Sequence, residues 1–356
     1  MNIGAITFDM TRKKGATAMT RSSSPNRRRA LTGLGSIALA PFALPARGQG
    51  PGAVVIYTSN NAQAFETVQD VARKKMPGVK VSAITGGSGQ LLRRLEAEAA
   101  KPQGDVFWSS SANTLGAFSA LFEPYRSPEL AAIPKALQHP TGLWSAANVH
   151  VVVAMVNRNQ LGGVHLPKTW ADLLDPRLKG KISIADPANS STALTVLWGV
   201  EKMLGPDALK RLAAQVKVTS AAATVLRAVG QGEFAVGLTF EANAYAYVAG
   251  GQKEISLVYP SDGTFITAEY LALMKGAPGG ALAQRACDLL LSKEVQTELL
   301  LSAFRRPARS DIDVAKLVDL PAMASIKVFP IDEEEAAAKR GEFLKRWQAL
   351  VAVAGS

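Results

Sequence analysis

The sequence predicts an α/β protein of two lobes joined by two crossing strands. Strand and helix signals alternate along most of the chain. Two long apolar runs, Trp144–Val156 and Ile266–Met274, enclose a block of about 120 residues that shows the same alternation. The simplest architecture inserts this block into the first lobe, with the two runs as connecting strands. We therefore expect lobe one to comprise 49–148 and 269–356, including C-terminal helices, and lobe two to comprise 149–268.

Three strand signals begin the first lobe, and each ends in a loop rich in Ser, Thr, Asn or Gly. These strands are predicted at Val54–Tyr57, Val79–Ile84 and Asp105–Trp108. A helix over Ala64–Lys75 is indicated by apolar residues at helical spacing, and another is predicted over Leu91–Ala100 after a glycine-rich loop. The repeated order of strand, polar loop and helix is typical of α/β folds.

The enclosed block repeats this order. Strands are predicted at Ile182–Ala185 and Phe234–Thr239, and a polar turn over 186–192 leads into a helix at Ala193–Met203. In open α/β sheets, ligands bind outside the carboxyl ends of the strands. The polar loops of both lobes are therefore expected to face a common cleft.

The N-terminal segment, 1–48, is predicted to be an export signal. It holds eight Lys or Arg and one acid; the remaining chain has 32 basic and 28 acidic residues, so most of the formal charge of +11 belongs to this segment. The basic group Arg27–Arg29 precedes a weakly apolar stretch, Ala30–Ala46, which is too short and too interrupted by Gly and Pro for a membrane span. A small-x-small cleavage site, 46–48, follows. Because a nucleic-acid-binding protein keeps its basic surface in the folded part, no nucleic-acid partner is expected.

The residues at 26–31 (NRRRAL) resemble a twin-arginine signal, with Asn and Ala in place of the preferred Ser or Thr and Phe. An ordinary Sec signal with an additional Arg is the alternative. Either route predicts a periplasmic location for the mature chain.

The single cysteine, Cys287, excludes an internal disulfide, so stability is expected to come from core burial. The three histidines, His139, His150 and His165, lack metal-ligand spacing. The sequence has no Walker loop, no G-x-S-x-G and no H-E-x-x-H motif. Neither a cofactor nor enzymatic activity is expected, and a periplasmic enzyme is kept as the alternative.

Four segments of the chain have a distinctive pattern of residues: GGSGQLLRRLEAEAAKPQGDVFWSS (86–110), PKTWADLLDPRLKGKISIADPANSSTA (167–193), VLRAVGQGEFAVGLTFEANAY (225–245) and FPIDEEEAAAKRGEFLKRWQ (329–348). They resemble the extracellular solute-binding proteins that include receptors for ferric ion, 2-aminoethylphosphonate, phosphoglycerate and hexose phosphate. The resemblance implies a periplasmic-binding-protein-like fold whose lobes close on a solute. It further implies a monomer that docks on the permease of an ABC importer. A sensor that passes the solute to a membrane kinase is an alternative with the same fold.

The polar loops supply the candidate ligand-binding residues. Loops at helix starts expose unpaired backbone N–H groups and the positive end of the helix dipole, which favour anions. Hydroxyl and amide groups in the same loops add donors. The alternative is that each of these side chains only caps its own helix. The candidates are Ser59, Asn60, Gly87, Ser88, Ser109, Ser110, Ser190, Ser191 and Thr192.

The residues after the strand predicted at Phe234–Thr239 bear on the class of solute. The resemblance implies that ferric-ion receptors of this group carry two adjacent tyrosines there, whereas this chain has Phe240 and Glu241. Tyr245 and Tyr247 are two residues apart and are expected on different faces of a helix. A dedicated iron site is therefore not expected, although a ferric-ion receptor remains the alternative.

Two charged positions complete the candidate set. Glu241 is expected to face the cleft, where a carboxylate suits a solute with hydroxyl or ammonium groups, such as a sugar phosphate or an aminoalkylphosphonate. Arg305 is the ligand-binding candidate from an arginine-rich segment, FRRPARSDI, in which Arg306 and Arg309 are further candidates for an anion clamp, since Arg engages phosphate bidentately. The alternative for Glu241 is a surface acid at a helix start, and the alternative for Arg305 is a solvated basic loop. The sequence thus predicts a receptor for a small anionic solute, phosphorylated or phosphonate-bearing.

Overall fold

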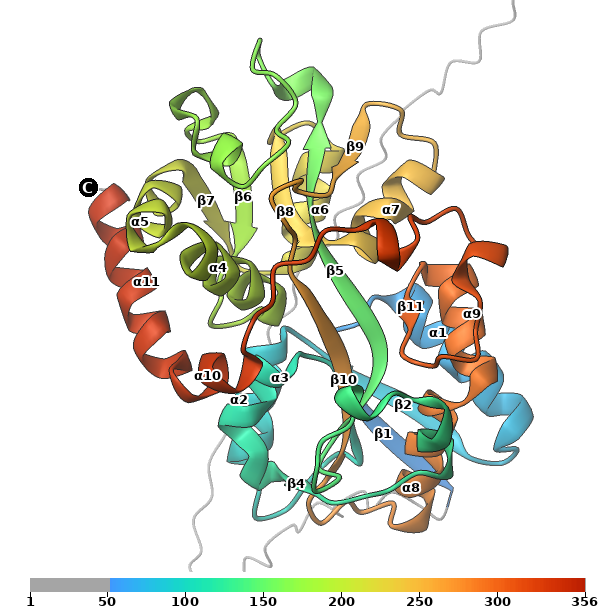
Figure 1. Cartoon of the computed structure of the whole chain (residues 1–356). Helices are drawn as coiled ribbons and strands as arrows, with labels where there is room; N and C mark the ends of the chain where they lie inside the picture. Colours follow the sequence, from blue (N-terminus) through green and yellow to red (C-terminus); the bar gives the residue numbers. More distant parts are fainter. Residues whose placement is uncertain (1–51, 356) are drawn as a thin grey trace, which may run out of the picture. The chain divides into compact units, whose positions relative to one another are not determined.

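The computed structural model describes residues 52–355, and the predicted export segment lies outside them. The two largest hydrophobic cores of this part of the molecule mark two lobes. Representative residues of the first core are Tyr57, Phe107 and Trp108, whereas Trp170 and Trp198 lie in the second. The predicted α/β fold of two lobes is therefore confirmed (Figure 1).

The first lobe is built on a sheet in which β1 lies between β2 and β3, with all three strands parallel. The short β4 pairs with β10. The strands are β1 (Ala53–Thr58), β2 (Lys80–Thr85), β3 (Val106–Trp108) and β4 (Phe122–Glu123). The helices that follow the first three strands are α1 (Ala62–Lys75), α2 (Ser88–Ala97) and α3 (Ala112–Leu115). Helix α2 begins earlier than predicted, because Gly87 is its N-cap and the Gln90 side chain accepts from the Gly87 N–H at 3.2 Å.

The second lobe is a sheet in which β6 lies between the parallel strands β7 and β8. The strands are β6 (Ile182–Ala185), β7 (Val216–Thr219), β8 (Val236–Phe240) and β9 (Ile255–Val258). The helices are α4 (Ser191–Leu204), α5 (Pro206–Gln215), α6 (Ala222–Gly230) and α7 (Glu241–Ala249). Helix α4 is buried along most of its length, which explains its apolar sequence.

Two antiparallel strands, β5 (Ser145–Asn157) and β10 (Ile266–Met274), connect the lobes, as predicted. Strand β10 pairs with β3 of the first lobe, and β5 pairs with β8 of the second. Figure 1 shows the two strands passing from one lobe to the other. The pairing shifts register between Glu269 and Tyr270, and this irregularity lies within the hinge.

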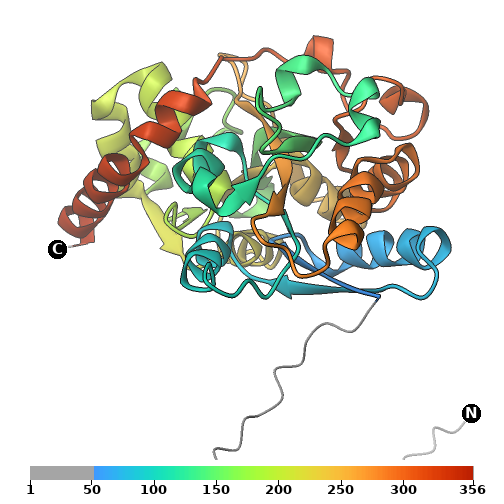
Figure 2. The ribbon, with the colours of Figure 1, turned by 90° about the horizontal axis from the view of Figure 1, so that it is seen from below.

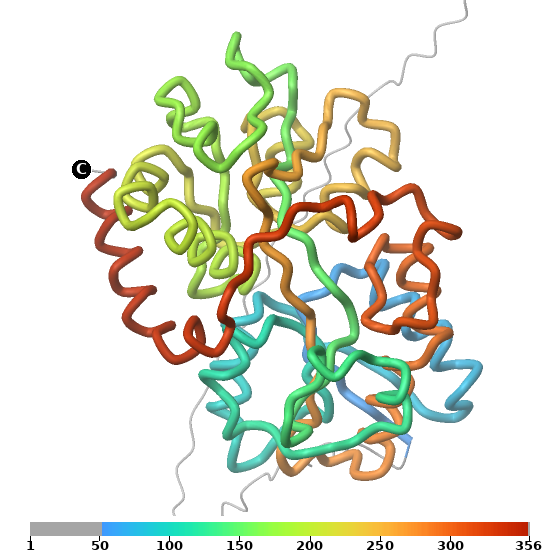
Figure 3. Tube along the Cα trace, viewed as in Figure 1, coloured from blue at the N-terminus to red at the C-terminus, as the bar shows by residue number. Residues whose placement is uncertain are grey.

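The remaining elements are α8 (Ala281–Leu291), α9 (Lys293–Ala303), β11 (Arg306–Pro307), α10 (Glu333–Ala338) and α11 (Arg340–Gly355). Figure 3 shows the chain between β11 and α10 crossing in front of the hinge strands. Helix α10 packs against α3 of the first lobe, whereas α11 packs against α5 of the second (Figure 2). Phe343 and Trp347 of α11 belong to the second core. The last helix thus covers lobe two, which corrects the expectation that the segment 269–356 returns to lobe one.

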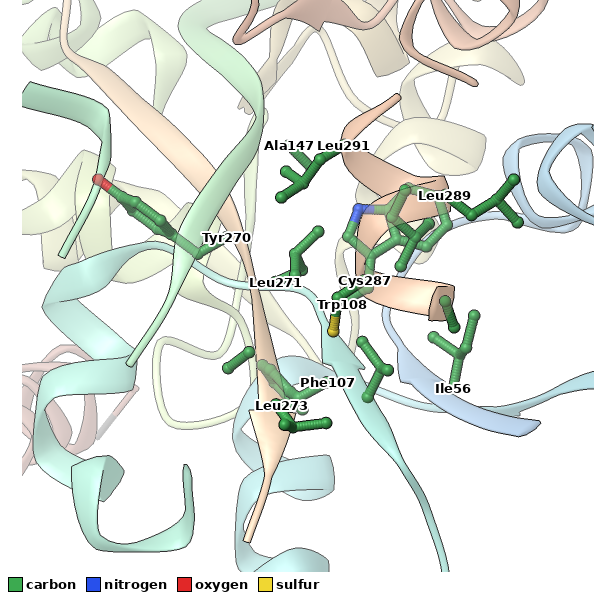
Figure 4. Packing of buried hydrophobic residues seen from close by; sticks show 14 of the residues in the cluster. Ile56, Phe107, Trp108, Ala147, Tyr270, Leu271, Leu273, Cys287, Leu289 and Leu291 are labelled. Atoms are coloured by element: carbon green, nitrogen blue, oxygen red, sulfur yellow. The ribbon is translucent and has the colours of Figure 1, made fainter. Parts of the chain in front are cut away.

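Cys287 of α8 lies in the first core near Trp108 and Leu271 (Figure 4). Burial raises the pKa of its thiol well above the ordinary range. Cys287 therefore behaves as a small apolar residue. No helix among residues 52–355 combines the length and apolar character needed to cross a membrane.

Candidate ligand-binding site

A cavity of about 410 Å³ lies between the lobes, where the predicted polar loops meet. Its volume is suited to a small solute. The first lobe contributes Ser59, Asn60, Asn61, Thr85, Gly86, Gly87, Ser88, Gln90 and Ser110. The second contributes Asn189, Ser190, Ser191, Thr192, Ala221, Ala222, Ala223, Leu226, Phe240 and Asn243. His150, Glu269 and Arg305 of the hinge region complete the lining.

The structure brings nine of the eleven predicted residues to this cavity: Ser59, Asn60, Gly87, Ser88, Ser110, Ser190, Ser191, Thr192 and Arg305. Ser109 lies directly behind the lining and is fully buried. Its hydroxyl is 2.5 Å from the Ser59 Oγ and 3.0 Å from the Ser88 Oγ. Ser109 therefore positions two lining hydroxyls and does not itself face the cavity.

Glu241 was expected to face the cavity, but in the structure it does not line the cavity. Its carboxylate, only 1% exposed, accepts from the Arg306 guanidinium at 2.6 and 2.8 Å and from the Tyr259 hydroxyl at 2.6 Å. Glu241 is the first residue of α7, and its side chain reaches β11, whereas Phe240 and Asn243 take the cavity positions. The Glu241–Arg306 pair joins α7 to β11.

Glu269 of β10 and His150 of β5 are cavity residues that were not predicted. Glu269 lies 3.3 Å from the Arg305 guanidinium and 3.7 Å from His150 Nε2, and His150 stacks on Phe240 with ring centroids 4.3 Å apart. Burial by itself would raise the pKa of Glu269, but Arg305 and His150 outweigh burial and the pKa is lowered. Both residues could have been found from the sequence, because each is an ionisable residue within a long apolar strand. A buried sheet rarely holds ionisable groups that have no partner or function.

Three buried polar atoms at the cavity have no hydrogen-bond partner among residues 52–355: Ser110 Oγ, His150 Nδ1 and Arg305 Nε. Each of these residues is at most 5% exposed, and the three come from widely separated segments of the chain. Buried polar atoms almost always have a partner, so three on one cavity favour a polar ligand there. Ser110 also has a φ of 77°, a left-handed conformation that is uncommon for residues other than glycine and is found preferentially at functional sites.

Five helices begin at the cavity: α1, α2, α4, α6 and α7. Ser190 caps α4 through its hydroxyl, which accepts from the Ala193 N–H at 3.3 Å, so the capping interpretation holds for this residue. It does not hold for Ser59, because Asn61 caps α1 and accepts from the Ala64 N–H at 3.0 Å. The N-terminal N–H groups and dipoles of these helices favour negative charge in the cavity.

Full charges on the cavity lining are nearly balanced. Arg305 and Glu269 pair with each other, and His150 is the other ionisable side chain of the lining. Within residues 52–355, no cluster of three or more His, Cys, Asp or Glu has the arrangement of a metal site. The cavity therefore presents mainly neutral donors and helix N-termini.

Comparisons with known proteins agree with this geometry. The family model described as bacterial extracellular solute-binding protein matches residues 104–338. The chain is 31% identical over 273 residues to an uncharacterized protein of Haemophilus influenzae, an alignment that covers 72% of this chain and 78% of that protein. It is 25% identical over 309 residues to a putative 2-aminoethylphosphonate-binding periplasmic protein of Salmonella typhimurium, covering 80% and 86%. The structure of the periplasmic binding protein AfuA from Actinobacillus pleuropneumoniae, with fructose 6-phosphate bound, matches with a TM-score of 0.77 and 28% identity, covering 85% and 99%.

Proposed function

This chain belongs to the bacterial extracellular solute-binding protein family, and we propose that it captures a small organic phosphate or phosphonate for an ABC importer. The observation that carries the proposal is the cavity between the lobes, which combines three unpartnered buried polar atoms with helix N-termini that favour anions. One relative is a putative 2-aminoethylphosphonate-binding protein, and the similar solved structure of AfuA holds fructose 6-phosphate; both are solutes of this kind. In this proposal the protein binds and delivers its solute without chemical turnover.

The anionic group of the solute lies at the starts of α2 and α4, within reach of Ser59, Ser110 and Ser191. Glu269 receives a hydroxyl or ammonium group from the other end of the solute. Because Arg305 is already paired with Glu269, an inorganic dianion would gain little net positive charge from the lining. An organic solute that carries both kinds of group complements the cavity better than inorganic phosphate does.

A ferric-ion receptor is the second candidate, because the family includes iron-uptake proteins. Fe(III) sites need hard anionic ligands, and Phe240 and Glu241 stand where the ferric-ion receptors are expected to carry tyrosines. The Glu241 carboxylate is paired with Arg306 and does not line the cavity, and neither Tyr245 nor Tyr247 does. These placements favour the organic anion.

We expect the loss of a single cavity hydroxyl to weaken solute binding at least about tenfold, because hydrogen bonds to charged groups contribute about 1.5–3 kcal/mol. Isothermal titration of fructose 6-phosphate and 2-aminoethylphosphonate into Ser59→Ala, Ser110→Gly and Ser191→Ala measures the loss. Ser110→Gly is the most informative variant, because glycine accepts the left-handed backbone of this position at no steric cost.

Ser292→Ala is the matched control, since the Ser292 hydroxyl caps α9 outside the cavity and accepts from the Val295 N–H at 3.2 Å. It should lower the melting temperature and leave affinity unchanged. Ser110→Gly should instead lower the affinity and leave the melting temperature unchanged. Unchanged affinity in all three cavity variants would contradict the proposed site.

We also propose that the chain is exported by the twin-arginine route, a prediction that rests on Arg27 and Arg28. Conservative replacement of both by lysine should leave the protein in the cytoplasm, because the twin-arginine machinery requires this pair. Fractionation of cells followed by immunoblotting measures the outcome. Unimpaired export of the Arg27→Lys, Arg28→Lys variant would indicate the Sec route.

A further inference from the structure

The two lobes touch at the rim of the cavity, where the loop before α4 lies on the first turn of α2. The Gly89 N–H of α2 donates to the Asn189 carbonyl at 3.3 Å. The Arg93 guanidinium, also on α2, donates to the Ala188 carbonyl at 3.2 Å and to the Asn189 side chain at 2.7 Å. Leu92 of α2 belongs to the first core and Leu194 of α4 to the second, so these contacts join different lobes.

The loop that meets α2 is held in shape by its own hydrogen bonds. The Asp186 carboxylate accepts from the Ala188 N–H at 2.9 Å and from the Asn189 side-chain amide at 3.0 Å. The Asp186 backbone carbonyl accepts from the N–H groups of Asn189 and Ser190, both at 3.0 Å. The carbonyls of Ala188 and Asn189 are therefore presented to α2 by a preorganised loop.

Two glycines at the start of α2, the N-cap Gly87 and Gly89 of the first turn, leave the space that these carbonyls occupy. A Cβ at position 89 would lie 2.0 Å from the Ala188 oxygen, and one at position 87 would lie 2.6 Å from the Asn189 oxygen. Both obstacles are backbone atoms of the other lobe and cannot rotate away. Neither glycine has a positive φ, so the backbone conformation does not require glycine at these positions. Glycine is required there because the backbone of the second lobe approaches so closely.

We propose that Gly87 and Gly89 form a seat for the Ala188 and Asn189 carbonyls, and that this seat permits the lobes to close over the cavity. This inference rests on the proposed solute-binding function, because closure matters only if the cavity receives a ligand. Gly87 and Asn189 also line the cavity, so the seat adjoins the bound solute. A side chain at position 89 would force the loop back by about 1 Å to reach the shortest contact that real Cβ atoms show.

Gly89→Ala should therefore fold normally, remain open and bind weakly. Apparent affinity falls in proportion to the population of the closed state, so we expect a loss of about tenfold or more for fructose 6-phosphate. Gly87→Ala should have a smaller effect, because its Cβ overlaps less. The matched control is Gly341→Ala, in the first turn of α11, where an added Cβ meets no atom within 4 Å.

Lobe separation can be measured by electron–electron resonance between spin labels at Lys101→Cys and Lys217→Cys. Both lysines are exposed on different lobes, and the native Cys287 is buried and stays unlabelled. The wild type and Gly341→Ala should populate the distance of the closed structure, more so with fructose 6-phosphate. Gly89→Ala should lack this distance with and without the solute, while its ligand-free melting temperature matches that of Gly341→Ala.

The outcomes separate this inference from the proposed function. If wild type binds no organic phosphate or phosphonate yet Gly89→Ala loses the closed distance without solute, the seat stands and the proposed function fails. Three results would overturn the seat. They are a Gly89→Ala protein that closes as wild type does, a large loss of its ligand-free melting temperature, and a wild type that never populates the closed distance.

Discussion

Replacing Glu241 by alanine is expected to lower the free energy of unfolding by about 3–5 kcal/mol and to leave solute affinity nearly unchanged. The substitution leaves the Arg306 guanidinium, which is 3% exposed, without the carboxylate that accepts two of its hydrogen bonds. The Tyr259 hydroxyl loses its acceptor as well. An unpaired charge buried in this way is among the most destabilising consequences of a single substitution.

Urea unfolding and calorimetric titration of the same variant distinguish stability from binding. Asp70→Ala provides a control, because Asp70 pairs with Arg73 on the exposed surface and such pairs contribute less than about 1 kcal/mol. The double variant Glu241→Met, Arg306→Met should recover much of the lost stability, since apolar replacements remove both buried charges. Full stability of Glu241→Ala with strongly reduced affinity would instead restore Glu241 as a ligand-binding residue.

Replacing Glu333 by glutamine is expected to stabilise the protein strongly at pH 8 and only slightly at pH 5. Glu333 begins α10, and the Thr267 hydroxyl of the hinge strand β10 donates to its carboxyl group. Burial raises the pKa of Glu333 from 4.5 to about 7. The folded state therefore binds a proton that the unfolded state releases, and stability falls as the pH rises from about 4.5 through 7.

The cost of ionising this group reaches about 3 kcal/mol at pH 8, where glutamine cannot ionise and avoids it. Glutamine can still accept from Thr267. Denaturant unfolding of both proteins at the two pH values measures the difference. Glu334→Gln, at the exposed next position, should match wild type at each pH. Equal stability of Glu333→Gln and wild type at pH 8 would contradict the buried-acid account.

Periodicity and loop composition predicted most of the fold from sequence. The hinge strands were recognisable because their length and apolar character exceed those of the other strands, and Ile266–Met274 was predicted with the bounds that the structure has. Polar loops at the carboxyl ends of strands correctly indicated that Ser59, Ser110 and Ser191 meet at one cavity. These features are local, and local patterns are what a single sequence records.

The charged residues could not be placed in the same way. Glu241 and Glu269 both lie near hinge segments, but only the three-dimensional path of β11 determines that Arg306 meets the first and Arg305 the second. Ion pairs between residues so far apart in sequence leave no periodic signal. The packing of Trp347 in the second core likewise depends on the course of the chain after β11.

Native mass spectrometry of freshly exported and purified protein tests the central claim most directly, because it shows what the cavity holds when the cell supplies the solute. The account predicts a phosphorus-containing organic adduct that is displaced by fructose 6-phosphate or 2-aminoethylphosphonate and is lost from Ser110→Gly. A tightly held Fe(III) adduct with a visible phenolate charge-transfer colour, together with no adduct from any organic phosphate or phosphonate, would contradict it.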